Sequence, residues 1–419
     1  MAKVGRKGFF GAAVFLFLIF GFFQGKGYTD NFDAIVVPTL MDSKMDSWFK
    51  TPQESAPVIN KVSTICRGQF FNIAIFFRNY ALDKNNNADI TYDFQMYDPS
   101  GKPTEDNGNN IAAYKGHVEN PNVLLLNEQQ FLRVVLTDKY TLGSYKIKAV
   151  GHDNISGKSC VVESSVELVL FSLGDKFGSK EKVGAWIMGY HRSPQPQRSI
   201  NALLESVPTD PAGIQKNLST LAFFRRIFED NPFLWDEALK IFDKFSLEEK
   251  KKLLLVYALV PKDKSVLPEK MDESLTSFYN QAESIKIPST DKAITTADQL
   301  DVLWSEFLAS GTYVPIQKIV SALALSEYRG TIDKIKSKEI KEVTKEVKDR
   351  AMLDAVYQSA IWSLISNCKQ MPLVFNYCGY MYESEKLDEN IKKQLGTILS
   401  LVHKELKKKT QNEKISNNK

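Results

Sequence analysis

Hydrophobic and polar residues alternate along the early part of the chain, before the spacing becomes helical. The run ITYDFQM at residues 90–96 places an apolar side chain at every second position, which predicts a strand with one buried face. By alternation and apolar content, strands are expected at residues 71–77, 90–96, 132–136, 145–149 and 161–170. Clusters of Asp, Asn, Pro, Ser and Gly separate several of these runs. Several short strands with such turns predict an antiparallel β-sandwich over residues 58–172.

After residue 172 the apolar residues recur at steps of three and four, which is the period of a helix with one buried face. Residues that can cap a helix start are Ser179, Asp210, Ser246 and Thr296. Many helices of modest length follow one another through short turns, without a fixed repeat. The pattern predicts an irregular α-solenoid or a helical bundle over residues 173–403.

The chain is therefore expected to be multidomain, all-β and then all-α, as its 419 residues also suggest. The predicted parts are a leader (1–27), a linker or arm (28–57), the sandwich (58–172), the α-helical domain (173–403) and a basic, disordered tail (404–419). Residues 45–49 (MDSWF) are the apolar knot of the arm. We expect this knot to pack onto the chain's own domain, and a docking patch for a partner is the alternative.

Residues 142–149, LGSYKIKA, resemble the segment that leads into the penultimate strand of immunoglobulin-like sandwiches. The resemblance implies an immunoglobulin-like fold, in which the hydroxyl of Tyr145 braces a corner of the backbone. The core cysteine of that family would fall at Ile147, so the chain departs from the family there. The resemblance covers about a quarter of the chain and concerns the fold, because a fold of this kind carries many functions.

Two further segments are similar to stretches in uncharacterised bacterial exported proteins. They are residues 186–194 (WIMGYHRSP) and 303–311 (LWSEFLASG). Such proteins join a sandwich to a C-terminal helical domain. The similarity implies this architecture and no named function.

An apolar run at residues 9–23 follows Lys3, Arg6 and Lys7, which is the layout of a secretory signal. The run is short for a membrane span, which needs about 20 apolar residues. We expect cleavage near Gly25 or Gly27, with an uncleaved anchor as the alternative. The rest of the chain is then periplasmic or secreted, or tethered to the inner membrane by residues 9–23, and membrane contact is expected only through this segment.

The formal net charge of +4 is concentrated at the two ends of the chain. The leader and the segment from residue 404 each contribute +4, which leaves the body at −4. A folded domain that binds nucleic acid normally carries its own basic field, so this class of partner is disfavoured.

Cys66, Cys160, Cys368 and Cys378 make an even number of cysteines in a chain expected to be exported, which favours disulfides. One bridge in each domain would join Cys368 to Cys378 and Cys66 to Cys160. Free buried thiols are the alternative, because small cysteines pack well in cores. No pair has the spacing of a redox motif or a zinc site.

Catalytic signals are weak throughout. The four histidines have no paired spacing, and no nucleophile elbow, phosphate-binding loop or dinucleotide fingerprint is present. We therefore predict no catalytic residue, metal site or cofactor. The most suggestive polar cluster is Trp186, Tyr190, His191 and Arg192, just before the break Ser-Pro-Gln-Pro. It is either a recognition pocket or an ordinary helix end with cations near its dipole.

These observations favour an exported bacterial envelope protein that acts as a non-enzymatic binding or scaffold module. Its partner is expected to be a protein or an envelope polymer. One alternative is an envelope hydrolase, with an acidic pair or a histidine in a cleft of the helical domain. Another is a secretion or assembly factor that accepts a partner strand at a sandwich edge.

Overall fold

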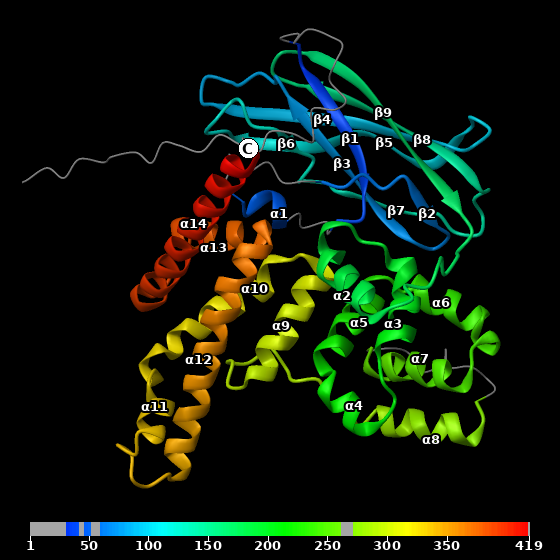
Figure 1. The fold of residues 1–419 in the computed structure, drawn as a ribbon. Coiled ribbons are helices and arrows are strands. Elements are labelled where there is room, and N and C mark those ends of the chain that lie inside the picture. The colour runs from blue at the N-terminus through cyan, green and yellow to red at the C-terminus, as the bar shows by residue number, and fades with distance from the viewer. Residues whose placement is uncertain (1–30, 42–45, 52–58, 261–270, 418–419) are drawn as a thin grey trace, which may run out of the picture.

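The structure, a computed structural model, describes residues 31–41, 46–51, 59–260 and 271–417. A sheet-rich N-terminal region is followed by a helical C-terminal region, and the helices lie along one side of the sheets (Figure 1). The predicted order, sheet first and helices second, is confirmed at this level. The predicted leader lies outside the described residues.

The strands of the N-terminal region are β1 (Asp33–Thr39), β2 (Thr64–Cys66), β3 (Phe70–Arg78), β4 (Asn87–Tyr97), β5 (Pro103–His117), β6 (Leu125–Leu126), β7 (Leu132–Val135), β8 (Gly143–Asp153) and β9 (Lys158–Val169). Within the described residues they form two sheets. One has the order β1-β3-β6, with β7 also paired to β3, and the other has the order β2-β9-β8-β4-β5. Neighbouring strands are antiparallel except β2 and β9, which are parallel.

The two sheets enclose one hydrophobic core, to which alternate residues of β3, β4 and β8 contribute. The alternating runs predicted at 71–77, 90–96 and 145–149 are therefore confirmed as strands with a face in this core. Tyr145 is buried, and its hydroxyl donates a hydrogen bond of 2.8 Å to the carbonyl oxygen of Thr141. This is the backbone contact that the resemblance implied. Ile147 fills the core at the position of the absent cysteine.

Four of the described strands lie where none was predicted: the short strands β2 and β6, and the longer strands β1 and β5. Strand β1 falls in the segment expected to be a linker, and it pairs along its whole length with β3. Its sequence, DAIVVPT, is a short apolar run interrupted by Pro38 and has no alternation of polar and apolar residues. Strand β5 is rich in Asn and Gly and half exposed, which resembles a loop, yet it pairs with β4 across three register irregularities.

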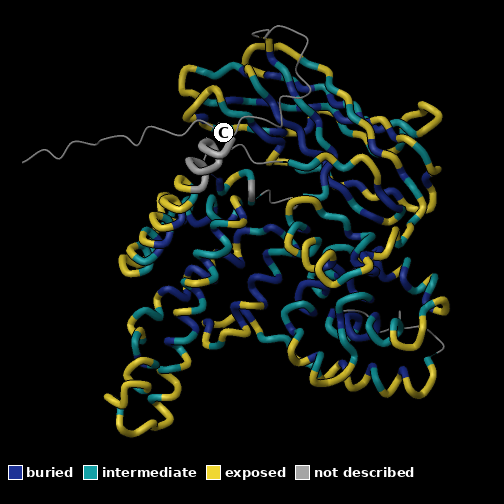
Figure 2. Tube along the Cα trace, in the orientation of Figure 1, coloured by how far each residue is buried: buried dark blue, intermediate teal, exposed yellow. Residues whose placement is uncertain are grey.

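The helical segments are α1 (Asp46–Phe49), α2 (Lys180–Gly189), η2 (Tyr190–Arg192), η3 (Pro196–Arg198), α3 (Ser199–Ser206), α4 (Pro211–Lys216), α5 (Leu218–Asp230), α6 (Phe233–Lys240), η4 (Phe242–Lys244), α7 (Leu247–Leu259), α8 (Glu273–Ala282), α9 (Ala297–Ser310), α10 (Tyr313–Ser321), η6 (Ala322–Tyr328), α11 (Thr331–Lys336), α12 (Lys345–Gln370), α13 (Pro372–Ser384) and α14 (Glu389–Asn417). Apart from α1, they pack around two successive cores. The first is built mainly by α2 to α8 and the second by α9 to α14. The buried residues of these helices are dark blue in Figure 2.

The predicted helix starts are confirmed. Ser179 accepts a backbone hydrogen bond at the start of α2, and Asp210 does so at the start of α4. Ser246 and Glu249 form the capping box of α7, and α9 begins directly after Thr296. Short-range capping chemistry therefore sets these boundaries, as the sequence indicates.

The segment predicted as a basic tail, residues 404–419, lies within helix α14 as far as the structure describes it. Helix α14 continues to Asn417. Leu395, Ile398 and Val402 are buried against the second helical core. Lysine and glutamate are good helix formers, so a helix nucleated on this buried stripe extends through the charged residues that follow.

Strand β3 joins the two regions because both of its faces are buried. One face fills the core between the sheets, and Ala74 and Phe76 on the other face pack in a separate cluster with Trp48 of α1. The rings of Trp48 and Phe76 lie 4.8 Å apart. The apolar knot thus packs onto the chain's own sheet, in agreement with the first of the two expectations.

Helix α1 also contacts the helical region. The Asp46 carboxylate accepts a hydrogen bond of 2.9 Å from the backbone N–H of Tyr313, at the start of α10. The Lys50 ammonium lies 4.4 Å from the centre of the Tyr313 ring. We call residues 46–50 the strap, because they connect the outer face of the sheet to the helices.

Among the described residues, no helix is both long enough and apolar enough to cross a membrane.

Candidate functional site

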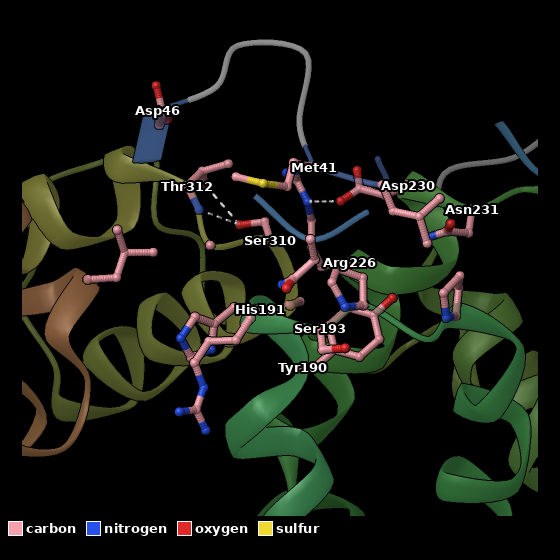
Figure 3. Close-up of a pocket in the computed structure, with 18 of the residues that line it drawn as sticks. Met41, Asp46, Tyr190, His191, Ser193, Arg226, Asp230, Asn231, Ser310 and Thr312 are labelled. Atoms are coloured by element: carbon pink, nitrogen blue, oxygen red, sulfur yellow. Dashed lines mark hydrogen bonds and ion pairs between the residues drawn. The ribbon is translucent and has the colours of Figure 1, made fainter. Parts of the chain in front are cut away.

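A cavity of about 800 Å³ lies between the outer face of the β1-β3-β7 sheet and the ends of several helices. We call it the interface cavity. Its sheet side is formed by Leu40, Met41, Asn60, Phe70, Asn72 and Arg133, together with Asp46 of the strap and the adjacent Thr51. Its helical side is formed by residues 189–194, Pro196, Arg226, residues 229–232, residues 309–312, and Pro372, Leu373 and Asn376. Figure 3 shows Asp46 and Thr312 at one end, and Asp230 and Asn231 at the other.

The helices stop at the cavity for local reasons. Helix α2 passes into η2 before Pro194 and Pro196, which cannot continue a regular helix. Helix α9 ends at Gly311, whose φ of 67° is the left-handed conformation that glycine adopts at a helix end. Helix α13 begins with Pro372 at its first position. The cavity is therefore lined by helix ends and turns, where backbone polar groups are available.

His191 lies in the wall of the cavity, with its ring 5.0 Å from that of Phe307. Both ring nitrogens are buried, and neither has a hydrogen-bond partner among the described residues. Burial, together with the charge of Arg192, lowers the pKa of His191 to about 4. The imidazole is therefore neutral at pH 7, with one nitrogen able to donate a hydrogen bond and the other able to accept one.

Asn72 is the polar residue in the centre of the sheet wall. It is 1% exposed, and its side-chain N–H donates a hydrogen bond of 2.6 Å to the carbonyl oxygen of Met41. Its side-chain oxygen is buried and has no partner within the described part of the chain. A buried polar atom without a partner costs about 1–3 kcal/mol, so it is favourable for a ligand or water to reach it.

Arg226 of the helical wall and Arg225 beside it are paired with carboxylates, whereas Arg192 of the same wall is exposed and has no ion-pair partner among the described residues. The Arg226 Nε lies 2.8 Å from an oxygen of Asp230, four residues later on α5. Arg225 lies beside the cavity, 3.5 Å from Glu229 of its own helix and 3.5 Å from Glu306 of α9. This mixed-charge network binds α5 to α9 and leaves the wall polar without a large excess of either sign.

Burial raises the pKa of both Glu229 and Glu306, and the neighbouring Arg225 and Arg226 offset part of that rise. Glu229 lines the cavity, whereas Glu306 is not part of its lining. The structure thus brings together two partly buried carboxylates on either side of Arg225, of which one faces the cavity.

A second hollow of about 550 Å³ lies on the other side of residues 189–193, along one face of α2. We call it the basic groove. It is lined by Lys176, Phe177, Lys182, Ala185, Trp186, Gly189, Ser193, Gln195 and Arg198. The Arg198 guanidinium lies 4.2 Å from the centre of the Phe177 ring. None of the described residues that line the groove is acidic.

The structure divides the predicted recognition cluster between these two hollows. Tyr190, His191 and Arg192 line the interface cavity, and Trp186 lines the basic groove. Tyr190 is 3% exposed, and its ring packs 5.1 Å from Trp186 and 5.6 Å from Phe223. Trp186 and Tyr190 therefore have a structural role in the first helical core, while His191 and Arg192 face the cavity.

The predicted disulfide partners have different placements. The sulfurs of Cys368 and Cys378 lie 3.9 Å apart as free thiols, both buried between α12 and α13. Cys66 lies beside Val169, and Cys160 is nine residues earlier on the same strand, about 30 Å away at roughly 3.3 Å per residue. The structure therefore brings the first pair together and does not bring the second pair together.

The other histidines lie outside the two hollows. His152 contacts Asp93 at 3.0 Å and Ser159 at 2.9 Å on the surface of the β4-β8-β9 sheet. His117 lies at the end of β5, and His403 is exposed on α14. Among the described residues, no three His, Cys, Asp or Glu side chains are arranged to hold a metal ion.

Comparison with known proteins gives little more. No family model matches the chain, and no curated protein matches it. Among solved structures it is similar to a family 123 glycoside hydrolase from Clostridium perfringens, described for glycolipid glycan hydrolysis, at 9% identity and a TM-score of 0.21. The match covers 45% of this chain and 36% of that enzyme, so it spans about a third of the enzyme. A TM-score of this size carries no argument about fold or function.

Several cavity residues were missed by sequence reasoning. Arg226 and Asp230 are four apart on a helix, a spacing that usually marks an ordinary surface pair. Asn72 is the polar exception in the apolar run FFNIAIFF at residues 70–77. Such a continuous apolar run is typical of a strand buried on both faces, and a polar residue within it is the signal that could have indicated the cavity.

Proposed function

We propose that the protein is an exported bacterial envelope protein whose interface cavity binds a polar ligand without chemical conversion. The expected ligand class is a protein segment or a fragment of an envelope polymer. The observation that supports this proposal is the buried Asn72 oxygen, which has no partner among the described residues and lies in the wall of a cavity of about 800 Å³. A cavity of this size accommodates a ligand of several rings or residues.

The chemistry of the walls supports a hydrogen-bonding ligand of low net charge. Asn72 offers an acceptor, and neutral His191 offers one donor and one acceptor. Arg133, Arg192 and Arg226 of the lining are balanced in number by its carboxylates Asp46, Glu229 and Asp230, so the cavity does not select strongly for an anion. Pairing of the charges before a ligand arrives also favours binding over acid–base catalysis.

The proposal is tested with soluble oligosaccharide fragments of envelope polymers and with short neutral peptides, by native mass spectrometry of the full-length protein. We expect a one-to-one complex with one of these classes. Asn376→Trp fills the cavity from α13 and should abolish the complex. Ser384→Trp, on the same helix but outside the cavity lining, is the matched control and should leave it intact. Absence of any complex, or a complex unaffected by Asn376→Trp, would overturn the proposal.

A second candidate, an envelope hydrolase, is supported by the raised pKa of Glu229 in the cavity wall. A carboxyl group with a raised pKa can serve as a general acid. If this reading is right, a member of the same ligand panel is cleaved, and Glu229→Gln abolishes cleavage while binding persists. Binding without cleavage by the wild-type protein favours the first proposal.

We also infer that the N-terminal region is an immunoglobulin-like sandwich. The order β9-β8-β4-β5 beside a β1-β3-β7 sheet is the pairing expected for such a sandwich, and the Tyr145 contact to Thr141 supports the same assignment. The edge strand β5 is irregular and carries Glu105, Asp106 and Lys115. Irregular, charged edges discourage strand addition, so this edge does not favour an assembly factor.

A further inference from the structure

Two hollows share one stretch of chain. Gly189 and Ser193 line both the interface cavity and the basic groove. The cavity and the groove are therefore adjacent, on either side of this segment. The charges that line the groove then indicate which chemical group of a ligand it would bind.

The described lining of the groove contains three cations and no carboxylate, whereas the lining of the cavity also contains Asp46, Glu229 and Asp230. Lys182 and Arg198 have no ion-pair partner among the described residues, and Lys176 lies 3.9 Å from Glu249, at the limit of an ion pair. A carboxylate next to the groove, that of Glu205, already has other hydrogen-bond partners. Glu205 accepts hydrogen bonds of 2.7 Å from the backbone N–H groups of Phe177 and Gly178.

The arrangement also limits the size and shape of the group that fits. The planar guanidinium of Arg198 stacks over Phe177, which holds it at the wall. Lys176 and Lys182 are exposed and able to move towards a bound group. Three cations around one hollow match a phosphate, which carries close to two negative charges at pH 7 and three acceptor oxygens. A carboxylate carries half that charge and uses fewer donors.

We propose that the basic groove is a subsite for a phosphate group of the ligand whose polar body occupies the interface cavity. The inference rests on the proposed binding function and narrows its ligand class to phosphorylated polar compounds. In this arrangement Arg198 donates hydrogen bonds to the phosphate from the N–H groups at the edge of its guanidinium, while Lys182 and Lys176 supply further charge. The neutral part of the ligand meets Asn72 and His191.

Equilibrium dialysis of the full-length protein at low ionic strength tests the subsite with radiolabelled inorganic phosphate. We expect saturable uptake of one phosphate per chain, weakened about tenfold by Lys182→Gln combined with Arg198→Gln. Lys182→Gln alone, an exposed substitution that does not threaten folding, should weaken uptake by a smaller factor. Lys180→Gln is the matched control, because Lys180 is exposed on the same helix but does not line the groove.

The source of the phosphate is tested with glucose 6-phosphate as a competitor. Tighter binding of the ester than of inorganic phosphate supports a ligand-borne phosphate, whereas equal binding overturns that part of the inference. Acetate and sulfate are compared as competitors of the labelled phosphate, because acetate is a carboxylate and sulfate is a tetrahedral dianion. If acetate displaces phosphate as strongly as sulfate does, the assignment to phosphate is overturned. Absence of phosphate uptake, or uptake unchanged in the Lys182→Gln, Arg198→Gln double variant, overturns the subsite. The proposed binding function is tested separately, by the ligand complex of the cavity and its loss in Asn376→Trp.

Discussion

The interface cavity and the basic groove lie on two sides of residues 189–193, and their linings differ in charge. The described lining of the cavity contains carboxylates beside its arginines, and that of the groove contains no acidic residue. Around the cavity, Arg225 and Arg226 are partly buried and contact carboxylates. In the groove, Lys182 is exposed and has no ion-pair partner within the described residues. A buried cation must be paired to offset its lost hydration, whereas an exposed cation stays hydrated without a partner. Burial alone thus gives neighbouring hollows different ligand chemistry.

The largest change in stability is expected when the ion pairs of Arg225 beside the cavity are removed. Arg225→Leu leaves Glu229 and Glu306 partly buried without their shared cation, and should destabilise the fold by about 3 kcal/mol. Urea unfolding followed by circular dichroism measures the change. Adding Glu306→Gln should recover part of the loss, because it removes one of the uncompensated carboxylates. A loss below about 1 kcal/mol in Arg225→Leu would contradict the pairing argument.

The turn between α12 and α13 borders the cavity through Pro372 and Leu373, and not the groove. The thiols of Cys368 and Cys378 are 3.9 Å apart beneath it. In an oxidising compartment we expect them to form a disulfide, which should stabilise the fold by roughly 2.5 kcal/mol through the short loop that it closes. Mass spectrometry after mild oxidation should show the loss of two hydrogens in the wild type and not in Cys378→Ser. An unchanged wild-type mass would contradict this expectation.

Acid should lower the stability of the fold through the cavity residue His191, because its imidazole is buried and neutral. Its folded pKa of about 4 lies below the ordinary value of 6.5. The unfolded chain therefore takes up this proton first as the pH falls, and stability declines between about pH 6.5 and pH 4 by roughly 2.5 kcal/mol. Unfolding measured across this window should show the decline in the wild type and a flatter profile in His191→Phe. Identical profiles would contradict the buried, neutral assignment.

The strap contacts the cavity but not the groove. Asp46→Ala removes the carboxylate that accepts the Tyr313 N–H at the start of α10, which should cost about 1 kcal/mol. We expect ligand binding in the cavity to weaken and phosphate uptake to stay unchanged. Thermal unfolding and dialysis measure the two effects in one preparation. Equal loss at both hollows would show that they are not separate.

The smallest effect on stability is expected in the groove itself. Lys182→Gln removes an exposed cation without an ion-pair partner in the described chain, so the free energy of unfolding should change by less than about 0.5 kcal/mol. Phosphate uptake should nevertheless weaken. A destabilisation comparable to that of Arg225→Leu would mean that the groove lysine supports the fold and would remove the contrast between the two hollows.

Much of the architecture follows from local pattern. The alternation at 90–96 and the capping residues Ser179, Asp210 and Ser246 are short-range signals, and the strand and helices lie where they indicate. Strand β5 was missed because one face is exposed and its Asn and Gly content suggests a turn. Strand β1 was missed because its stability comes from pairing with β3, some 40 residues later in the chain.

The candidate site was predicted only in part. His191 and Arg192 were identified from their position at a helix end, and both line the cavity. Asn72, Arg226 and Asp230 were not identified, because each looks ordinary among its sequence neighbours. Their importance arises from the approach of β3 to α5 and the helix ends, which lie more than a hundred residues later in the sequence.

The sequence by itself determined the order of sheet and helices, most of the helix starts and the position of the break after α2. These features depend on interactions within a few residues, which composition and spacing record directly. Only the tertiary structure decided that β3 is covered on both faces, that Asp46 caps a helix far along the chain, and that one segment separates a charge-balanced cavity from a basic groove. Such features depend on which surfaces meet, and burial then decides which charges must be paired.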